Sequence, residues 1–166
     1  EAGEEVSLLL CTLVGHLWGY HSARALDEAA LPLRRAREAT EAALARSVER
    51  RAADGSDGFD EGPLHALRPE LAPVAREFAT RMAAGRFNSG LEVETASRLS
   101  LLFKYVLGRA TLDDFEQDFG VAPTTDNLLR EFLRHLSSGI DELRRPIDAI
   151  KHQAKTVTVG VSRIEE

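Results

Sequence analysis

The sequence predicts an all-α helical bundle that ends in a short C-terminal β-strand, and three observations support this fold class. Apolar residues recur at spacings of three and four along most of the 166 residues, which is typical of helices that pack on one side. Glycine and proline separate these stretches from one another. Residues 156–161 instead alternate valine with threonine or glycine, which is the period of a half-buried strand.

The first helix is expected over roughly residues 4–30, and it is apolar on most of its sides. Bulky side chains lie beside a strip of small residues that recur every fourth position: Ser7, Cys11, Gly15, Gly19 and Ala23. A helix that is apolar on most sides is buried on most sides, so it belongs at the centre of the bundle or against another domain. Pro32 then opens a second, outer helix that ends near residue 53.

Proline and glycine set the limits of the middle helices. Residues 54–62 are turn formers, and Pro69 and Pro73 confine a regular helix to about residues 73–84, with a kink before it. The next helix is expected to end near Leu107. Ser89 and Glu92 make a Ser-x-x-Glu capping box at its start.

The last helices are a short one, which Thr111 caps and Gly120 closes, and a long one from about Thr125. Pro146 should kink the long helix or restart it as a short segment that ends near residue 154. The strand that follows cannot pair within an all-helical chain. We therefore expect its partner in another copy or in a further domain of a larger protein.

Composition excludes several functional classes. The net charge of −6, with arginines interleaved among glutamates, argues against a nucleic-acid-binding face. Residues 6–23 contain no Asp, Glu, Lys or Arg, but their serine, threonine, histidine and glycine content argues against a membrane span or signal peptide. Cys11 is the only cysteine, so no internal disulfide can form, and we expect a cytoplasmic protein.

Common catalytic and metal-binding patterns are missing from the sequence. His16 and His21 do not share a helix face, and His65, His135 and His152 are isolated, so we expect ordinary surface or core histidines. Residues 54–62 lack the spacing of a calcium loop, and Cys11 is expected to be a small buried hydrophobe rather than a nucleophile. We expect neither a metal nor a cofactor.

One basic cluster stands at the junction between the last helix and the strand. Its cations are Lys151, His152, Lys155 and Arg163, and the hydroxyls beside them belong to Thr156, Thr158 and Ser162. Such a set could hold an anion, and a desolvated lysine can form a Schiff base with a carbonyl. The simpler interpretation is that these cations complement the dipole of the helix C-terminus.

Two segments resemble a known family. Arg145-Pro146, followed by Ala154-Lys155-Thr156-Val157-Thr158-Val159, resembles the C-terminal tail of glucosamine-6-phosphate synthases, also called glutamine–fructose-6-phosphate aminotransferases. The segment HLWGYHSARALDEA, with Gly19-Tyr20-His21, resembles the last helix of their sugar-isomerase domain. GRFNSGLEVETASRLSLLFKY, combined with the basic tail, is similar to long multidomain members of this group.

The resemblance implies that Lys155 is the lysine that forms a Schiff base with a ketose phosphate. Lys151, His152, Thr156 and Thr158 would then bind substrate. Residues 1–30 would end a sugar-isomerase domain, residues 31–154 would form a helical insertion or linker domain, and residues 155–166 would lead into a further domain. Such a piece would not be active alone. The alternative is a free-standing module that forms a homodimer through its first helix or its terminal strand.

Overall fold

A computed structural model describes residues 2–55, 59–87 and 90–162, and side chains within them apart from those of Ala2, Glu4, Leu26, Asp54 and residues 146–162. Every element in these ranges is helical. The elements are, in chain order, α1 (Ala2–Asp54), α2 (Glu61–Ala83), α3 (Val93–Val106), the 3-10 turn η1 (Leu112–Asp114), α4 (Phe115–Phe119) and α5 (Thr125–Ser162).

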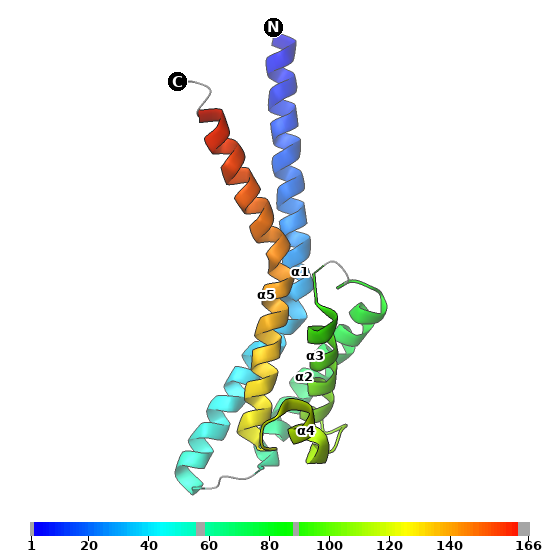
Figure 1. Ribbon diagram of the computed structural model, residues 1–166, viewed down its shortest axis with the longest axis vertical. Helices are drawn as coiled ribbons and strands as arrows, with labels where there is room; N and C mark the ends of the chain where they lie inside the picture. The colour runs from blue at the N-terminus through cyan, green and yellow to red at the C-terminus, as the bar shows by residue number, and fades with distance from the viewer. Residues whose placement is uncertain (1, 56–58, 88–89, 163–166) are drawn as a thin grey trace.

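The fold is a long antiparallel pair, α1 and α5, with the shorter helices on one side of it (Figure 1). Gly139 of α5 allows the close approach, because a Cβ there would lie 3.2 Å from Cδ1 of Leu33 in α1 and of Leu99 in α3. Both helices of the pair continue past the bundle at the same end of the molecule (Figure 1). We call residues 30–145 the bundle and residues 2–23 of α1 the arm.

Aromatic side chains link the helices inside the bundle. Phe78 of α2 packs against Phe103 of α3 with ring centroids 5.5 Å apart, and Phe103 meets Phe132 of α5 edge-on at 4.9 Å. Of the apolar residues that recur at spacings of three and four in α5, Leu129, Phe132, Leu136, Ile140 and Leu143 are buried and Leu133 is half-buried, while the side chains of Ile147 and Ile150 lie outside the described set. Burial of this kind is the main favourable contribution to folding.

Pro32 does not begin a new helix, so the expected break near residue 31 is wrong. A proline within a helix leaves the carbonyl four residues earlier, here that of Glu28, without its N–H donor. Arg81 of α2 supplies a replacement, because its Nη1 donates to the Glu28 carbonyl oxygen over 3.1 Å. Glu77 in turn holds the Arg81 guanidinium at 2.6 Å. This contact from another helix lets α1 continue.

The expected confinement of this helix to about residues 73–84 is also wrong, because α2 is one helix from Glu61 to Ala83 that contains both Pro69 and Pro73. Both prolines lie on an exposed face, where water can solvate the carbonyls that they leave unpaired. Apolar side chains that recur at helical spacing along α2 are buried, among them Leu64, Leu71 and Phe78.

The start of α3 differs from the expected capping box. Glu92 is the N-cap residue, and its side chain makes no capping hydrogen bond, while Ser89 lies outside the described residues. The backbone N–H of Glu92 instead donates to the Glu142 carboxylate of α5 over 2.8 Å. The acceptor seen for this N–H is thus a carboxylate on a distant helix. The expected short helix is divided into η1 and α4: Thr111 stands at the N-cap of η1 without a side-chain capping hydrogen bond, and Gly120 closes α4 at a φ of 71° as predicted.

The expected C-terminal strand is not seen, because α5 is continuous through Pro146 and residues 156–161 to Ser162. A helix satisfies its backbone N–H and C=O groups within one segment, whereas a single strand needs a second one. No strand lies in the described ranges to supply that pairing.

The arm is exposed, so the expectation that the first helix occupies the centre of the bundle is wrong. Large apolar side chains along it are at least half exposed: Val6, Leu8, Leu9, Leu10, Leu13, Val14, Leu17, Trp18 and Tyr20. The core begins only at Ala30. In the part of the chain that is described, no helix has the length and apolarity needed to cross a membrane.

Candidate functional site

The residues predicted to bind a sugar phosphate fall at the end of α5. The backbone of Lys151, His152, Lys155, Thr156 and Thr158 belongs to this helix, and their side chains lie outside the described set. Arg163 lies outside the described residues altogether. The assignment of Lys155 as a Schiff-base lysine therefore stays a prediction.

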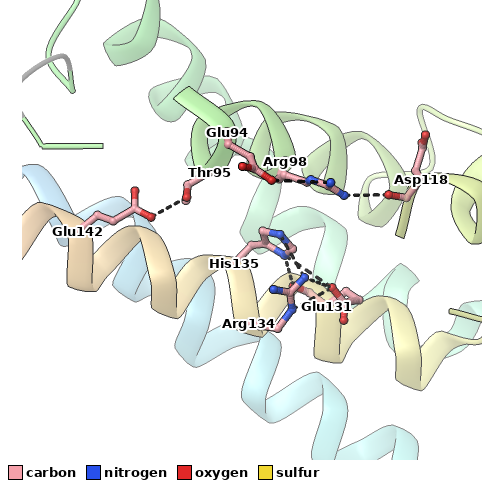
Figure 2. A network of polar contacts seen from close by, with 8 residues as sticks. All are labelled: Glu94, Thr95, Arg98, Asp118, Glu131, Arg134, His135 and Glu142. Atoms are coloured by element: carbon pink, nitrogen blue, oxygen red, sulfur yellow. Dashed lines mark hydrogen bonds and ion pairs between the residues drawn. The ribbon is translucent and has the colours of Figure 1, made fainter. Parts of the chain in front are cut away.

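A buried carboxylate joins α3 to α5 within the bundle. Glu142 is 3% exposed and accepts hydrogen bonds from the Thr95 hydroxyl at 2.6 Å and the Glu92 backbone N–H at 2.8 Å. The Ser138 hydroxyl also donates to it, at 3.2 Å. Figure 2 shows Glu142 reaching from α5 to Thr95. Because its acceptors are engaged, this carboxylate fixes the two helices rather than facing a ligand.

His135 lies near the centre of the same view, beside the ion pair of Arg134 with Glu131 (Figure 2). Its Nδ1 is 2.9 Å from the Glu131 carbonyl oxygen, and its ring packs edge-on against Phe119. Burial lowers the pKa of His135 below its ordinary value, and the charges of Arg134 and Arg98 lower it further. His135 is thus a satisfied core histidine, as the sequence suggested.

A second polar cluster closes the end of the bundle opposite the arm. Asp126 of α5 accepts a hydrogen bond from Ser47 at 2.6 Å and pairs with Arg51 at 3.2 Å, both in α1. The Thr125 hydroxyl accepts from the Asp60 backbone N–H at 2.8 Å and donates to the Asp60 carbonyl oxygen at 2.7 Å. These contacts hold the turn before α2 against the start of α5.

Tyr105 of α3 completes the internal polar contacts. Its hydroxyl donates to the Asp118 carboxylate over 2.7 Å, and its ring packs against Phe115. Burial raises the pKa of Tyr105 well above its ordinary value, and the hydrogen bond to Asp118 raises it further. The phenol therefore stays protonated and acts as a hydrogen-bond donor.

The other candidate groups are solvent-exposed. His16, His21 and His65 lie on the surface, and Cys11 is exposed rather than buried as expected. No three His, Cys, Asp or Glu side chains among the described residues gather as metal ligands would. The Asp60 carboxylate in the turn that had suggested calcium caps α2, accepting from the Gly62 N–H.

Depressions lie between the helices on the surface of the bundle. One of about 170 Å³ lies between α2 and α3, where Phe78 and Phe103 form its floor and Lys104 and Arg109 add positive charge. Its volume is below the roughly 300–1,000 Å³ of most small-molecule sites. A groove of about 560 Å³ between α1 and α2 lies at the base of the arm, lined by Glu28 and Arg81, which already contact one another.

Glu142, Asp126 and Thr95 are structural polar groups that were not predicted from the sequence. A signal for Asp126 was available, because it stands three residues before Leu129, on the apolar face of the same helix. An ionisable group on an apolar stripe usually has a specific partner. Glu142 gave a weaker signal, because the residues three and four before it are Gly139 and Ser138. The partners of both acids could not have been named, since they include residues on other helices.

Comparison with models of protein families, with curated proteins and with solved structures found no match to this chain. The resemblance to glucosamine-6-phosphate synthases accordingly depends on the quoted sequence segments alone. The geometry of the described residues supports structural roles for the polar side chains of the bundle, and it leaves the arm as the main surface without a partner.

Proposed function

We propose that this chain is a non-catalytic helical insertion or linker domain of a larger protein, in which the bundle is a spacer. One observation carries the proposal: α1 and α5 leave the bundle at the same end (Figure 1). An insertion into another domain needs both of its connections at one place, and this antiparallel pair provides them. The bundle then stands to one side of the protein that carries it.

The closed interior of the bundle agrees with this role. The buried ionisable side chains described in α5, Asp126, His135 and Glu142, have partners within the bundle. A general acid or base must instead reach a substrate atom. A spacer needs only a stable fold and fixed connections.

In the larger protein, we propose that the end of α5 lies near a sugar-phosphate site, as the resemblance to glutamine–fructose-6-phosphate aminotransferases implies. The amine of Lys155 would attack the ketose carbonyl and release water to form a Schiff base. Lys151 and His152 would attract the phosphate, and Thr156 and Thr158 would donate hydrogen bonds to it.

Borohydride trapping of fructose 6-phosphate on the intact gene product tests this assignment. We expect a covalent adduct on the peptide that contains Lys155, and its loss in Lys155→Arg. Lys104→Arg is the matched control, because Lys104 is another of the three lysines and lies in the bundle. An adduct that survives Lys155→Arg, or no adduct at all, would remove the catalytic role of Lys155.

A free-standing dimerisation module is the second candidate, and the arm favours it. Val6, Leu10, Leu13, Leu17 and Tyr20 follow alternating spacings of four and three, as along the seam of a coiled coil. These side chains are exposed in the single chain. A dimer at micromolar concentration by light scattering, lost in Leu13→Asp, would support this candidate over the insertion.

A further inference from the structure

The exposed arm carries an inference that rests on the proposed function and extends it. Residues 6–23 include no Asp, Glu, Lys or Arg, yet the large apolar side chains among them are at least half exposed. A solvated helix face normally carries charge. An uncharged run of this length on a surface requires a covering partner.

The bundle cannot cover the arm. Leu13 and Leu33 lie about 200° apart around a helix of 3.6 residues per turn, so they occupy nearly opposite faces of α1. Leu33 is fully buried against the bundle, whereas Leu13 is 56% exposed. The apolar stripe around Leu13 therefore faces away from the bundle and from the part of α5 that packs on Leu33.

One partner helix would cover only one stripe of the arm. Leu8 and Trp18 each lie about 140° from Leu13, on its two sides, and they are 70% and 66% exposed. A two-stranded coiled coil buries only the stripe around Leu13 and leaves its outer faces to charged residues. Those faces carry no charge here, so pairing with a second copy would leave Leu8 and Trp18 in water.

Two glycines give a separate indication. Gly15 and Gly19 stand within α1, where each costs roughly 1 kcal/mol of helix stability relative to alanine. A Cβ at either position would meet no atom within 4 Å. Nothing in the described part of the chain therefore requires a glycine at these positions, whereas a closely packed neighbour would.

We propose that the arm is an internal helix of an adjoining domain of the same gene product, enclosed on opposite faces by apolar side chains. Both α1 and α5 leave the bundle at this end, so the adjoining domain meets both (Figure 1). Its groove must be lined by aliphatic and aromatic residues. It must also offer one hydrogen-bonding group to the imidazole of His16, because an unpaired buried polar group is costly.

Cysteine accessibility tests this enclosure on two opposite faces. Cys11 and Leu13 lie about 200° apart around the helix, so native Cys11 reports one face, and Leu13→Cys in a Cys11→Ser background reports the other. Each thiol is alkylated under native conditions in this 166-residue chain and in the intact gene product, and the labelled peptides are quantified by mass spectrometry. Glu38→Cys, on the exposed face of α1 in the bundle, is the reactive control.

We expect both arm thiols to react freely in this chain and more than about tenfold more slowly in the gene product. An enclosed thiol can react with the reagent only when the structure around it opens locally. Glu38→Cys should react similarly in both. Protection of Leu13→Cys alone would show pairing along one stripe and overturn the proposal. The proposal would also be overturned if both thiols reacted freely in the gene product, if both were already protected in this chain by itself, or if protection required phospholipid vesicles.

The same samples separate this proposal from the proposed function. An intact mass well above that of this chain, with both thiols reactive, would refute the enclosure and leave the spacer role standing. A gene product of this chain's own size would remove the spacer role as well.

Discussion

Residues 34–51 of α1 carry nine charged side chains, whereas residues 6–23 of the same helix carry none. The first stretch buries Ala36, Thr40 and Ala43 against the bundle and exposes its charges. The arm exposes leucines and a tryptophan instead. Residues 34–51 of α1 thus bury one face and expose a charged face to water, whereas residues 6–23 are suited to burial on all faces. The change between the two stretches coincides with the base of the bundle.

Matched leucine truncations in the two parts should give the largest contrast. Leu33→Ala removes a fully buried side chain from the bundle, and we expect a loss of roughly 2–5 kcal/mol in the free energy of unfolding. Leu13→Ala should change it by less than about 0.5 kcal/mol in this chain, because Leu13 is exposed. Urea unfolding followed by circular dichroism measures both, and equal losses would contradict the distinction.

The buried carboxylate provides the next comparison. Glu142→Leu leaves the Glu92 N–H and the Thr95 hydroxyl without their acceptor, and we expect a loss of about 3 kcal/mol. Glu142→Gln retains one acceptor oxygen, so its loss should be smaller. The same urea titrations test this order. If the leucine variant is as stable as the glutamine variant, these hydrogen bonds do not stabilise the bundle.

The junction between arm and bundle should show a smaller effect. Arg81→Ala removes the donor to the Glu28 carbonyl, and we expect a loss of about 1 kcal/mol. In a Pro32→Ala background the backbone N–H of residue 32 becomes available again, so the effect of Arg81→Ala should shrink. Glu77→Ala, which removes only the Arg81 ion pair, is the control. An unchanged effect in the Pro32→Ala background would refute the compensation.

The smallest effect concerns pH. Because burial lowers the pKa of His135 below its ordinary 6.5, the unfolded chain binds more protons than the folded one between the two pKa values. The free energy of unfolding should therefore fall as pH decreases below about 6.5. His135→Gln should lose this part of the pH dependence. An identical slope in the variant would show that His135 does not contribute to it.

Local patterns in the sequence predicted the helical fold and most of the core. Phe78, Phe103 and Phe132, for example, belong to the apolar three-and-four spacing of their helices, and all three are buried. The errors occurred where a distant residue decides the outcome. Arg81 allows α1 to pass Pro32, and Glu142 sets the start of α3, and neither contact is visible in local sequence.

The C-terminal segment illustrates another limit. Its alternating valines predicted a strand, but residues 156–161 lie within α5. A two-residue period indicates which side chains would lie on each face of a strand. Whether a strand forms also depends on a second strand that pairs with its backbone N–H and C=O groups. The candidate site at Lys155 could be named only through a family resemblance. Spacing along the sequence does not show which side chains lie together in space to bind a substrate.

Hydrogen exchange measured on this chain and on the intact gene product tests the central claim most directly, namely that the bundle is complete and the arm is not. In this chain, amides of residues 6–23 should exchange much faster than those of residues 33–47, since the arm lacks tertiary contacts. In the gene product both stretches should be protected. Equal protection of the two stretches in this chain, or an arm that stays unprotected in the gene product, would contradict the account.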